Sequence, residues 1–156
     1  MKITSQEEYG LRCLLQVARL TLKNDLASLN DIAEAEKITP DYAAKLIMIL
    51  RQAELVESVR GKSGGYRLTR TPEKIYLDDV IKALSGELFE TSSCSQFPGN
   101  ESKCVHINCC SIRSVWFSVS QILFNLLKHI TLKDLLNEKE DALSKLIKNK
   151  LKVEAA

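Results

Sequence analysis

The stretch that decides the fold is LVESVRGKSGGYRL, residues 55–68. Apolar and polar side chains alternate over residues 55–59 and again over residues 66–69, which is typical of strands with one buried face. Residues 61–65, which lie between them, are glycine-rich and predict a tight turn. The stretch therefore predicts a two-stranded hairpin with a basic, glycine-rich tip. The alternative is an ordinary β-turn on a small α+β domain.

Three helices are predicted before the hairpin. Ser5 and Glu8 have the spacing of a capping box at the start of the first helix, and apolar residues follow at helical intervals. Ser28 is placed to cap the second helix, and Thr39, with Pro40 after it, to begin the third. We expect these helices over residues 6–22, 29–36 and 40–53.

Three helices followed by a hairpin is the element order of a winged helix-turn-helix. In that fold the third helix enters the DNA major groove and the hairpin touches the backbone or the minor groove. Residues 59–70 contain no acidic residue and four basic ones, which suits a phosphate-contacting element. These are Arg60, Lys62, Arg67 and Arg70. The predicted fold class is mainly α with a small β-hairpin.

Further elements are predicted downstream. A short helix over residues 77–84 ends at Ser85 and Gly86. A long helix over residues 111–130 has an apolar stripe that the preceding domain is too small to cover, so we expect it to pair with a second subunit. Thr131 is placed to cap a last short helix. The expected divisions are a winged helix-turn-helix domain at 1–85, a cysteine-bearing sensor loop at 86–110, a dimerisation helix and short helix at 111–136, and a charged tail at 137–156.

Composition fits one cytoplasmic domain with an added oligomerisation element. The chain has 156 residues, 45% of them hydrophobic and 27% charged, and a net charge of +2. No apolar run approaches the roughly 18 residues of a membrane span. Four of the five cysteines fall within residues 94–110, and clustered thiols in a reducing compartment more often bind metal or sense oxidants than form disulfides. The fifth, Cys13, lies among leucines and is expected to be a small buried hydrophobe.

Several separated motifs carry a resemblance to one family. They are Lys2-Ile3-Thr4, Tyr9-Gly10-Leu11-Arg12, Asp31-Ile32-Ala33-Glu34, Ile38-Thr39-Pro40-Asp41-Tyr42, the hairpin at 55–68, and ITLKDLL at 130–136. On these motifs the chain resembles the Rrf-two family of bacterial winged-helix regulators over nearly its full length. It is most similar to the cluster-binding branch, which senses iron, redox state or nitric oxide. The resemblance implies a homodimer that binds double-stranded DNA.

The resemblance also implies a ligand set for the cluster. Cys94, Cys104 and Cys110 take the places of the three cysteine ligands, and we expect a [2Fe-2S] cluster, with [4Fe-4S] as the alternative. Cys109 is then a spare thiol, because adjacent residues entering a helix point about 100° apart. One ligand position stays open. A relative fills it with histidine where this chain has Arg113, which stays protonated and cannot be a ligand.

Two residues are candidates for the fourth ligand. Glu8 stands where another relative supplies a carboxylate from its first helix, and its alternative role is the capping box with Ser5. His106 lies between two of the cysteines, and its alternative is an ordinary solvated side chain. A carboxylate or solvent ligand would leave the cluster more labile than four thiolates would.

The residues expected to contact DNA fall on the third helix and the hairpin. They are Thr39, Tyr42 and Lys45 on the helix, and Arg60, Lys62, Ser63 and Tyr66 on the hairpin. Lys45 can reach guanine O6/N7 or a phosphate, and Arg60 is expected in the minor groove. Gly64 and Gly65 would allow a close backbone approach. For Tyr42 the alternative is packing against the first helix. A homodimer would recognise an inverted-repeat operator.

The leading expectation is therefore a transcriptional regulator, a repressor, whose operator binding is controlled by the cluster. One alternative replaces the cluster with zinc or thiol oxidation at Cys104, His106, Cys109 and Cys110. Another regulates sulfur metabolism by binding a partner enzyme of cysteine synthesis. An enzyme is not expected, because the sequence has neither a Cys-x-x-Cys motif nor an acid/base constellation.

Overall fold

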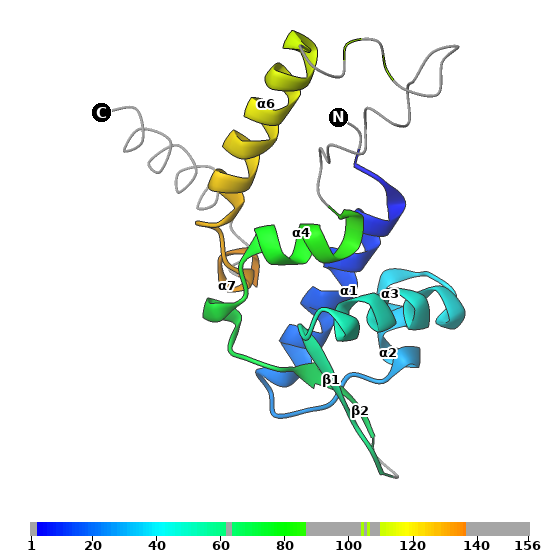
Figure 1. The fold of residues 1–156 in the computed structure, drawn as a ribbon. Helices are drawn as coiled ribbons and strands as arrows, with labels where there is room; N and C mark the ends of the chain where they lie inside the picture. Colours follow the sequence, from blue (N-terminus) through cyan, green and yellow to red (C-terminus); the bar gives the residue numbers. More distant parts are fainter. Residues whose placement is uncertain (1–2, 62–63, 87–103, 105, 107–109, 137–156) are drawn as a thin grey trace.

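The computed structural model describes residues 3–61, 64–86, 104, 106 and 110–136 (Figure 1). In chain order the elements are α1 (Ser5–Thr21), α2 (Leu29–Glu36), α3 (Pro40–Gln52), β1 (Val56–Val59), β2 (Gly65–Leu68), the 3-10 turn η1 (Pro72–Lys74), α4 (Leu77–Ser85), α6 (Ser111–Leu127) and α7 (Leu132–Leu136). The predicted fold class, mainly helical with one hairpin, is confirmed. The predicted tail at 137–156 lies outside the described residues.

The first helix begins one residue earlier than predicted. Its N-cap is Thr4, whose backbone N–H donates to Glu7 Oε2 at 2.6 Å, while the Glu7 N–H donates to Thr4 Oγ1 at 3.4 Å. The predicted capping box of Ser5 and Glu8 is therefore wrong. Both pairs have the required spacing, and the tertiary fold decides between them because Glu7 is 7% exposed and bonded near the end of α4. Glu8 is left exposed and free of the capping role.

The helix-turn-helix forms where it was predicted. Ser28 caps α2 in a capping box with Asp31, and Thr39 caps α3 by accepting from the Tyr42 N–H at 3.3 Å. Between the two helices, Lys37 adopts a left-handed conformation with φ 55°, which ends α2 and lets the chain turn within three residues. The short connection sets α3 against α1 and α2.

The hairpin is antiparallel, with Val56 opposite Leu68 and Val59 opposite Gly65. A third backbone segment, not predicted, extends it. Ala27, in the connection between α1 and α2, exchanges two 2.9 Å hydrogen bonds with Tyr66. A Cβ at Gly65 would lie 2.9 Å from the Ala27 carbonyl oxygen, so the absent side chain allows this pairing. The close approach to DNA expected for this glycine stays a prediction, and the close contact observed is with Ala27.

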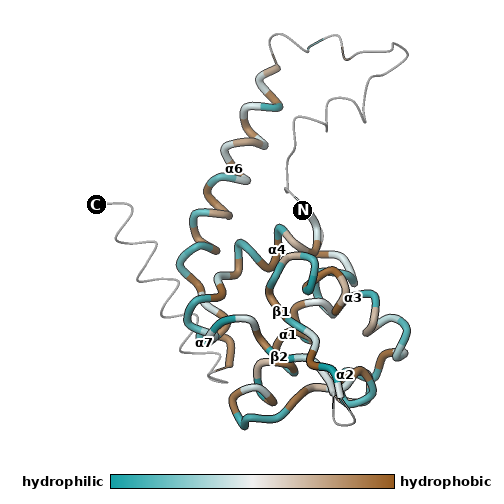
Figure 2. The backbone as a smooth tube through the Cα atoms, turned by 60° about the horizontal axis from the view of Figure 1, so that its bottom comes forward, coloured by the Kyte–Doolittle hydropathy of each residue, from teal (hydrophilic) through white to brown (hydrophobic). Residues whose placement is uncertain are grey.

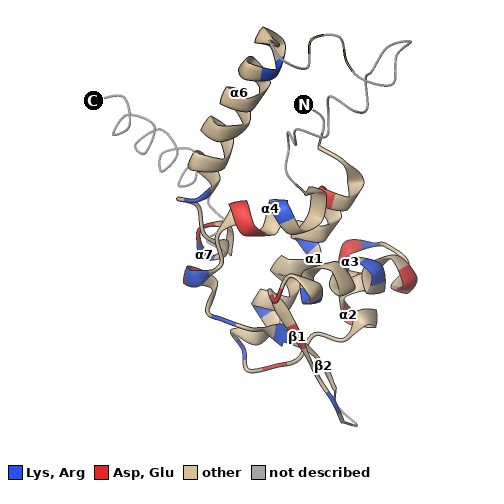
Figure 3. Ribbon diagram, viewed as in Figure 1, with Lys and Arg blue, Asp and Glu red and all other residues tan. Residues whose placement is uncertain are grey.

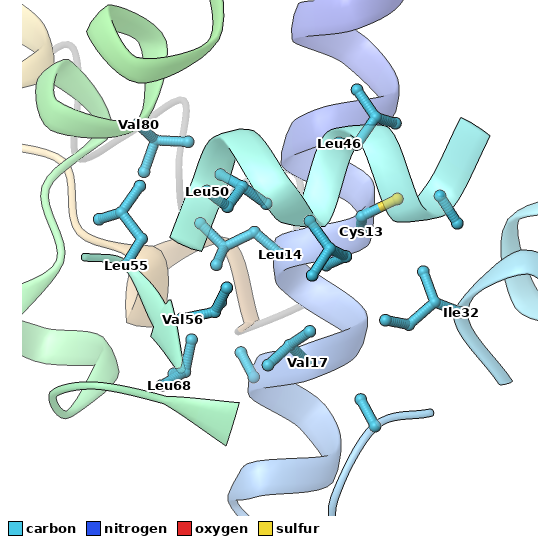
Figure 4. Packing of buried hydrophobic residues seen from close by; sticks show 14 of the residues in the cluster. Cys13, Leu14, Val17, Ile32, Leu46, Leu50, Leu55, Val56, Leu68 and Val80 are labelled. Carbon is cyan, nitrogen blue, oxygen red and sulfur yellow. The ribbon is translucent and has the colours of Figure 1, made fainter. Parts of the chain in front are cut away.

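The core lies between α1, α3 and the base of the hairpin (Figure 4). Its fully buried side chains include Leu14 and Val17 from α1, Leu46 and Leu50 from α3, and Val56 from β1. Burying each of the leucines contributes about 1.5–3 kcal/mol. This packing holds α3 with its opposite face outward.

Helix α6 leaves the rest of the fold and points away from the hairpin (Figure 1). It ends at Leu127, three residues before the predicted end, because Ile130 is drawn into a backbone bridge. In this bridge the Leu77 N–H donates to the Ile130 oxygen at 2.9 Å and the Leu132 N–H to the Ile75 oxygen at 2.8 Å. The C-terminal end of α6 is thereby fastened to the winged helix, whereas residues 111–119 are exposed.

Hydrophobic positions recur along α6 in the hydropathy colouring (Figure 2). Its exposed apolar side chains are Ile112, Val115, Trp116, Phe117, Val119 and Ile122. All except Phe117 fall within about 120° of the helix circumference at 100° per residue. Among the described residues no helix is long and apolar enough to span a bilayer.

Candidate nucleic-acid interface and cysteine site

One face of α3 is formed by four exposed residues. Asp41, Lys45, Met48 and Gln52 lie within about 60° of the helix circumference, since residues follow one another at 100°. The opposite face is buried and consists of Ala43, Leu46, Ile47 and Leu50. The four exposed residues, which we call the α3 stripe, form the surface that this helix offers to a macromolecule.

The structure places the three predicted recognition residues differently. Lys45 lies in the α3 stripe. Thr39 is exposed, but its hydroxyl accepts the Tyr42 N–H and caps the helix. Tyr42 is half-buried, and its ring lies edge-on to Tyr9 of α1, with centroids 6.1 Å apart. The alternative predicted for Tyr42, packing against the first helix, is therefore observed, at the margin of the stripe.

Met48 and Gln52 were not singled out from the sequence. Their spacing of seven and eleven residues from Asp41 is the signal that could have found them, because these intervals return to the same helix face. The residues predicted from the sequence lie in the first turns of the helix, whereas Met48 and Gln52 lie beyond them.

The basic residues of the hairpin region fall into two groups. Arg67 pairs with Glu57 across the strands at 2.7 Å, and Arg70 pairs with Asp79 at 3.3 Å. Arg60, exposed after β1, has no acidic partner among the described residues. In Figure 3 the described end of the hairpin carries positive charge and no negative charge. Arg60 is thus the better placed of the three for a phosphate or a groove.

Of the other hairpin residues predicted to contact DNA, Tyr66 is described by the structure. Tyr66 is half-buried beside an open groove between the hairpin and the start of α2. The groove is lined by Ser28, Leu29, Asn30, Ser58, Val59, Gly64, Gly65 and Tyr66. Lys62 and Ser63 lie outside the described residues. The hairpin and the start of α2 therefore share one surface.

Glu8 takes part in a small charged cluster on α1. Its carboxylate pairs with Arg12 at 2.8 Å, and Arg12 also reaches Glu36 of α2 at 3.9 Å. The Arg12 guanidinium lies 5.4 Å from the centroid of the Tyr9 ring, the same ring that contacts Tyr42. A contiguous set of contacts therefore runs from Glu8 to the recognition helix.

Two of the clustered cysteines are described. Cys104 and Cys110 are half-buried free thiols, and Cys110 is the N-cap of α6, with its Sγ accepting the Arg113 N–H at 3.3 Å. The Cys110 sulfur therefore lies directly at the N-terminus of α6. His106 is exposed. Cys94 and Cys109 lie outside the described residues.

The structure does not bring the predicted ligands together within its described part. Over those residues, no three His, Cys, Asp or Glu side chains are grouped as a metal site. Cys13 is fully buried, and burial, followed by the charge of Glu36, raises the pKa of its thiol to about 12. It is the small buried hydrophobe predicted from the sequence.

Three packed helices, a paired hairpin and an exposed stripe on the third helix define a winged helix-turn-helix protein of the DNA-binding class. The sequence model of the Rrf2 family, described as an iron-dependent transcriptional regulator, matches residues 3–138. The HTH-type transcriptional regulator NsrR of Bacillus subtilis is 33% identical over 150 residues, which cover 96% of this chain and 99% of NsrR. The chain therefore belongs to the Rrf2 family, as the sequence motifs predicted.

Solved structures agree with this assignment. T. potens IscR is similar with a TM-score of 0.69 and 32% identity, over 91% of this chain and 90% of IscR. CymR, the global cysteine regulator of B. subtilis, is similar with a TM-score of 0.66 and 27% identity, over 90% of this chain and 99% of CymR. The chain is a DNA-binding transcriptional regulator of this family, and the relatives named here are regulators rather than enzymes.

Proposed function

We propose that this regulator is a homodimeric repressor whose operator binding is controlled by a cysteine-ligated iron–sulfur cluster that senses iron, redox state or nitric oxide. The observation that carries the proposal is the position of Cys110. Its half-buried thiol caps α6 and accepts a backbone N–H, on the helix that carries an exposed apolar face. A ligand at this point connects a soft metal site to the segment proposed for dimerisation.

The described donors fit such a cluster in their chemistry. Cysteine thiolates are the usual ligands of iron–sulfur clusters, and Cys104 and Cys110 are both unpaired and partly accessible. We assign the third thiolate to Cys94, and the cluster to the [2Fe-2S] type, with [4Fe-4S] as the alternative. When bound, the cluster would supply a centre that oxidants, nitric oxide or iron loss can change. The family membership supports this assignment.

For the fourth ligand we favour Glu8 over His106, from the same or the partner subunit. The alternative role of Glu8 was the capping box of α1. Thr4 and Glu7 form that box instead, so Glu8 is available for another role. Its carboxylate would have to leave Arg12, which holds it at 2.8 Å. Because Arg12 also contacts Tyr9, and Tyr9 contacts Tyr42, an exchange of partners at Glu8 would reach the recognition helix.

The homodimer is proposed to form through the exposed apolar face of α6. Val119→Glu and Ile122→Glu place charges in that face and should shift the protein to a monomer in sedimentation experiments. Ser114→Glu adds the same charge on the opposite side of the helix and should leave the dimer intact. If both Val119→Glu and Ile122→Glu remain dimeric, the interface lies elsewhere on the protein.

The DNA surface is proposed to comprise the α3 stripe together with Thr39, Tyr42 and Arg60, with Lys62, Ser63 and Tyr66 on the hairpin. Arg60 is assigned to the minor groove. Arg60→Ala should weaken specific operator binding far more than Arg70→Ala, because Arg70 is already paired with Asp79. Equal losses in the two variants would contradict the assignment of Arg60.

The decisive experiment is anaerobic purification and reconstitution of the full chain. Iron, sulfide and visible absorption are measured, and operator affinity is then compared with and without the cluster. We expect a difference in affinity of about fivefold or more, the lower end of typical allosteric coupling. Protein that remains colourless and free of iron after reconstitution would rule the cluster out.

Cysteine variants give the matched controls. Cys104→Ala and Cys110→Ala should abolish the visible absorption, whereas Cys109→Ala should retain it. Retention in Cys110→Ala with loss in Cys109→Ala would reverse the assignment of the adjacent thiols. Glu8→Ala and His106→Ala, compared in the same assay, identify the fourth ligand by which of them changes the absorption spectrum.

A second candidate function is favoured by the similarity to CymR, the global cysteine regulator of B. subtilis. In this candidate the protein binds no cluster, and zinc or thiol oxidation at Cys104, His106, Cys109 and Cys110, or a partner protein of sulfur metabolism, controls it. Zinc is spectroscopically silent, so elemental analysis separates the two. Zinc at full occupancy without iron or sulfide would favour this second candidate.

A further inference from the structure

Met48 has an unusual position on α3. Every residue of this helix is described, and Met48 is its one exposed large apolar side chain, with 48% of its surface accessible. It lies in the middle of the α3 stripe, flanked by Lys45 and Gln52, while the buried apolar side chains occupy the opposite face. Packing within the protein therefore does not account for an apolar residue at this place.

The position of Met48 matters because of what α3 does. In a winged helix-turn-helix the second helix of the motif enters the major groove, and the exposed stripe of that helix meets the base edges. The other exposed apolar residues of the described chain lie mostly on α6, whose exposed face has its own proposed partner. Met48 is thus set apart by facing the surface where DNA is bound.

The major groove offers one methyl group, the 5-methyl group of thymine, and the other bases are distinguished there mainly by hydrogen-bond donors and acceptors. A methionine side chain is apolar, unbranched and adaptable, so it can cover a methyl group without an exact fit. Its neighbours in the stripe are suited to polar edges: Lys45 to guanine O6/N7, and Asp41 to the amino group of cytosine.

The spacing along the helix agrees with such a division. Lys45 and Met48 are three residues apart, or about 4.5 Å along the helix axis. Successive bases of one DNA strand are separated by about 3.4 Å. Side chains at these two positions can therefore reach neighbouring base pairs.

We propose that Met48 is a specificity-determining residue that contacts the 5-methyl group of a thymine beside the base pair contacted by Lys45. The proposal deepens the DNA-binding function of the chain and rests on α3 being the recognition helix. It does not require the identity of the cluster to be known, because it is argued from residues of α3 alone.

The test uses deoxyuridine, which differs from thymidine only by the missing methyl group. An operator is first selected from random DNA with the full-length protein purified anaerobically. Each thymine of one half-site is then replaced by uracil in turn, and the affinity of each DNA is measured by fluorescence anisotropy. For the wild type we expect one position at which uracil weakens binding about fourfold, as loss of one buried methyl group would.

Two variants at Met48 complete the test. Met48→Ala should bind the thymine and uracil forms of that position equally, whereas Met48→Leu, which keeps an apolar side chain, should retain the preference for thymine. Leu22→Ala is the matched control, because Leu22 is also exposed and apolar but lies at the end of α1. It should behave like the wild type on every DNA.

Three outcomes are distinguishable. If the cost of uracil at every thymine is the same for the wild type and for Met48→Ala, the proposed contact is overturned while DNA binding stands. If Leu22→Ala also loses the preference, the effect does not belong to Met48 and the proposal again fails. A protein that enriches no DNA sequence would overturn operator binding itself, and the contact with it.

Discussion

The rings of Tyr9 and Tyr42 meet edge to face, with their centroids 6.1 Å apart and their planes at 74°. Tyr9 belongs to α1 and Tyr42 to the recognition helix, so the contact fixes how α3 is held against the first helix. Arg12 contacts the same Tyr9 ring and is paired with Glu8. Contacts therefore connect the orientation of α3 to the ion pair near the start of α1.

Loss of this ring contact should destabilise the fold. Tyr9→Leu and Tyr42→Leu should each lower the free energy of unfolding, and the double variant should lose less than the sum. The expected coupling is about 1 kcal/mol, as measured for other aromatic pairs. Urea denaturation of the four proteins gives this coupling, and strictly additive losses would show that the two rings act independently.

The capping register at the start of α1 can be tested with two neighbouring carboxylates. Glu7→Gln should lower the free energy of unfolding by about 0.5–2 kcal/mol near neutral pH, because glutamine can keep the capping box but loses the negative charge that accepts the Thr4 N–H at the start of the helix. Glu8→Gln, the matched control, removes only an exposed pair with Arg12 and should cost about 0.5 kcal/mol or less. A larger loss of stability for Glu8→Gln than for Glu7→Gln would support the capping box of Ser5 and Glu8 that the sequence predicted.

The same Glu7 substitution has a defined pH dependence. Burial opposes ionisation, but hydrogen bonds from Thr4 and Ser85 hold the pKa of the Glu7 carboxyl below its ordinary value of 4.5. A carboxyl whose pKa is lower in the folded than in the unfolded protein stabilises the fold while it is ionised. This stabilisation is complete above pH 4.5 and is lost as the pH falls through the pKa of the folded state. The difference between wild type and Glu7→Gln should thus shrink as urea denaturation is repeated from neutral pH downward through the acid range. A difference that is constant with pH would contradict the assigned hydrogen bonds.

Gly10 shows how a long-range contact reverses a local preference. A Cβ added here would lie 2.8 Å from Leu84 Cδ1 of α4, so Gly10→Ala should destabilise the protein by about 1–3 kcal/mol despite the better helix propensity of alanine. In a Leu84→Ala background the space is free, and the same substitution should become stabilising by up to about 1 kcal/mol. The sign change is measured by thermal or urea denaturation, and its absence would show that Leu84 does not restrict Gly10.

Cys13 should be inert in the folded protein. Because burial raises the pKa of its thiol to about 12, the thiolate is nearly absent under mildly alkaline conditions and the sulfur is inaccessible. Alkylation of cluster-free protein, followed by mass spectrometry, should modify Cys104 and Cys110 and spare Cys13 until urea is added. Equal modification of Cys13 in the native protein would mean that α1 opens readily.

Local signals predicted much of the architecture. The caps at Ser28 and Thr39 involve residues three positions apart, and the alternation around residues 55–68 involves nearest neighbours, so both survive into the structure. The interface was predicted in part: Lys45 and Arg60 are exposed as expected, whereas Tyr42 is half turned toward Tyr9. The cysteine ligands stay a prediction, because Cys94 and Cys109 lie outside the described residues.

The sequence by itself determined the helices, the hairpin and the family, since these depend on periodicity, caps and turn residues within short windows of chain. Only the tertiary structure decided that Thr4 and not Ser5 caps α1, that Ala27 pairs with Tyr66, and that Arg70 is neutralised by Asp79. The physical reason is that each of these choices is made by packing or by a partner that no local pattern identifies. The same packing leaves Met48 exposed in the middle of the α3 stripe.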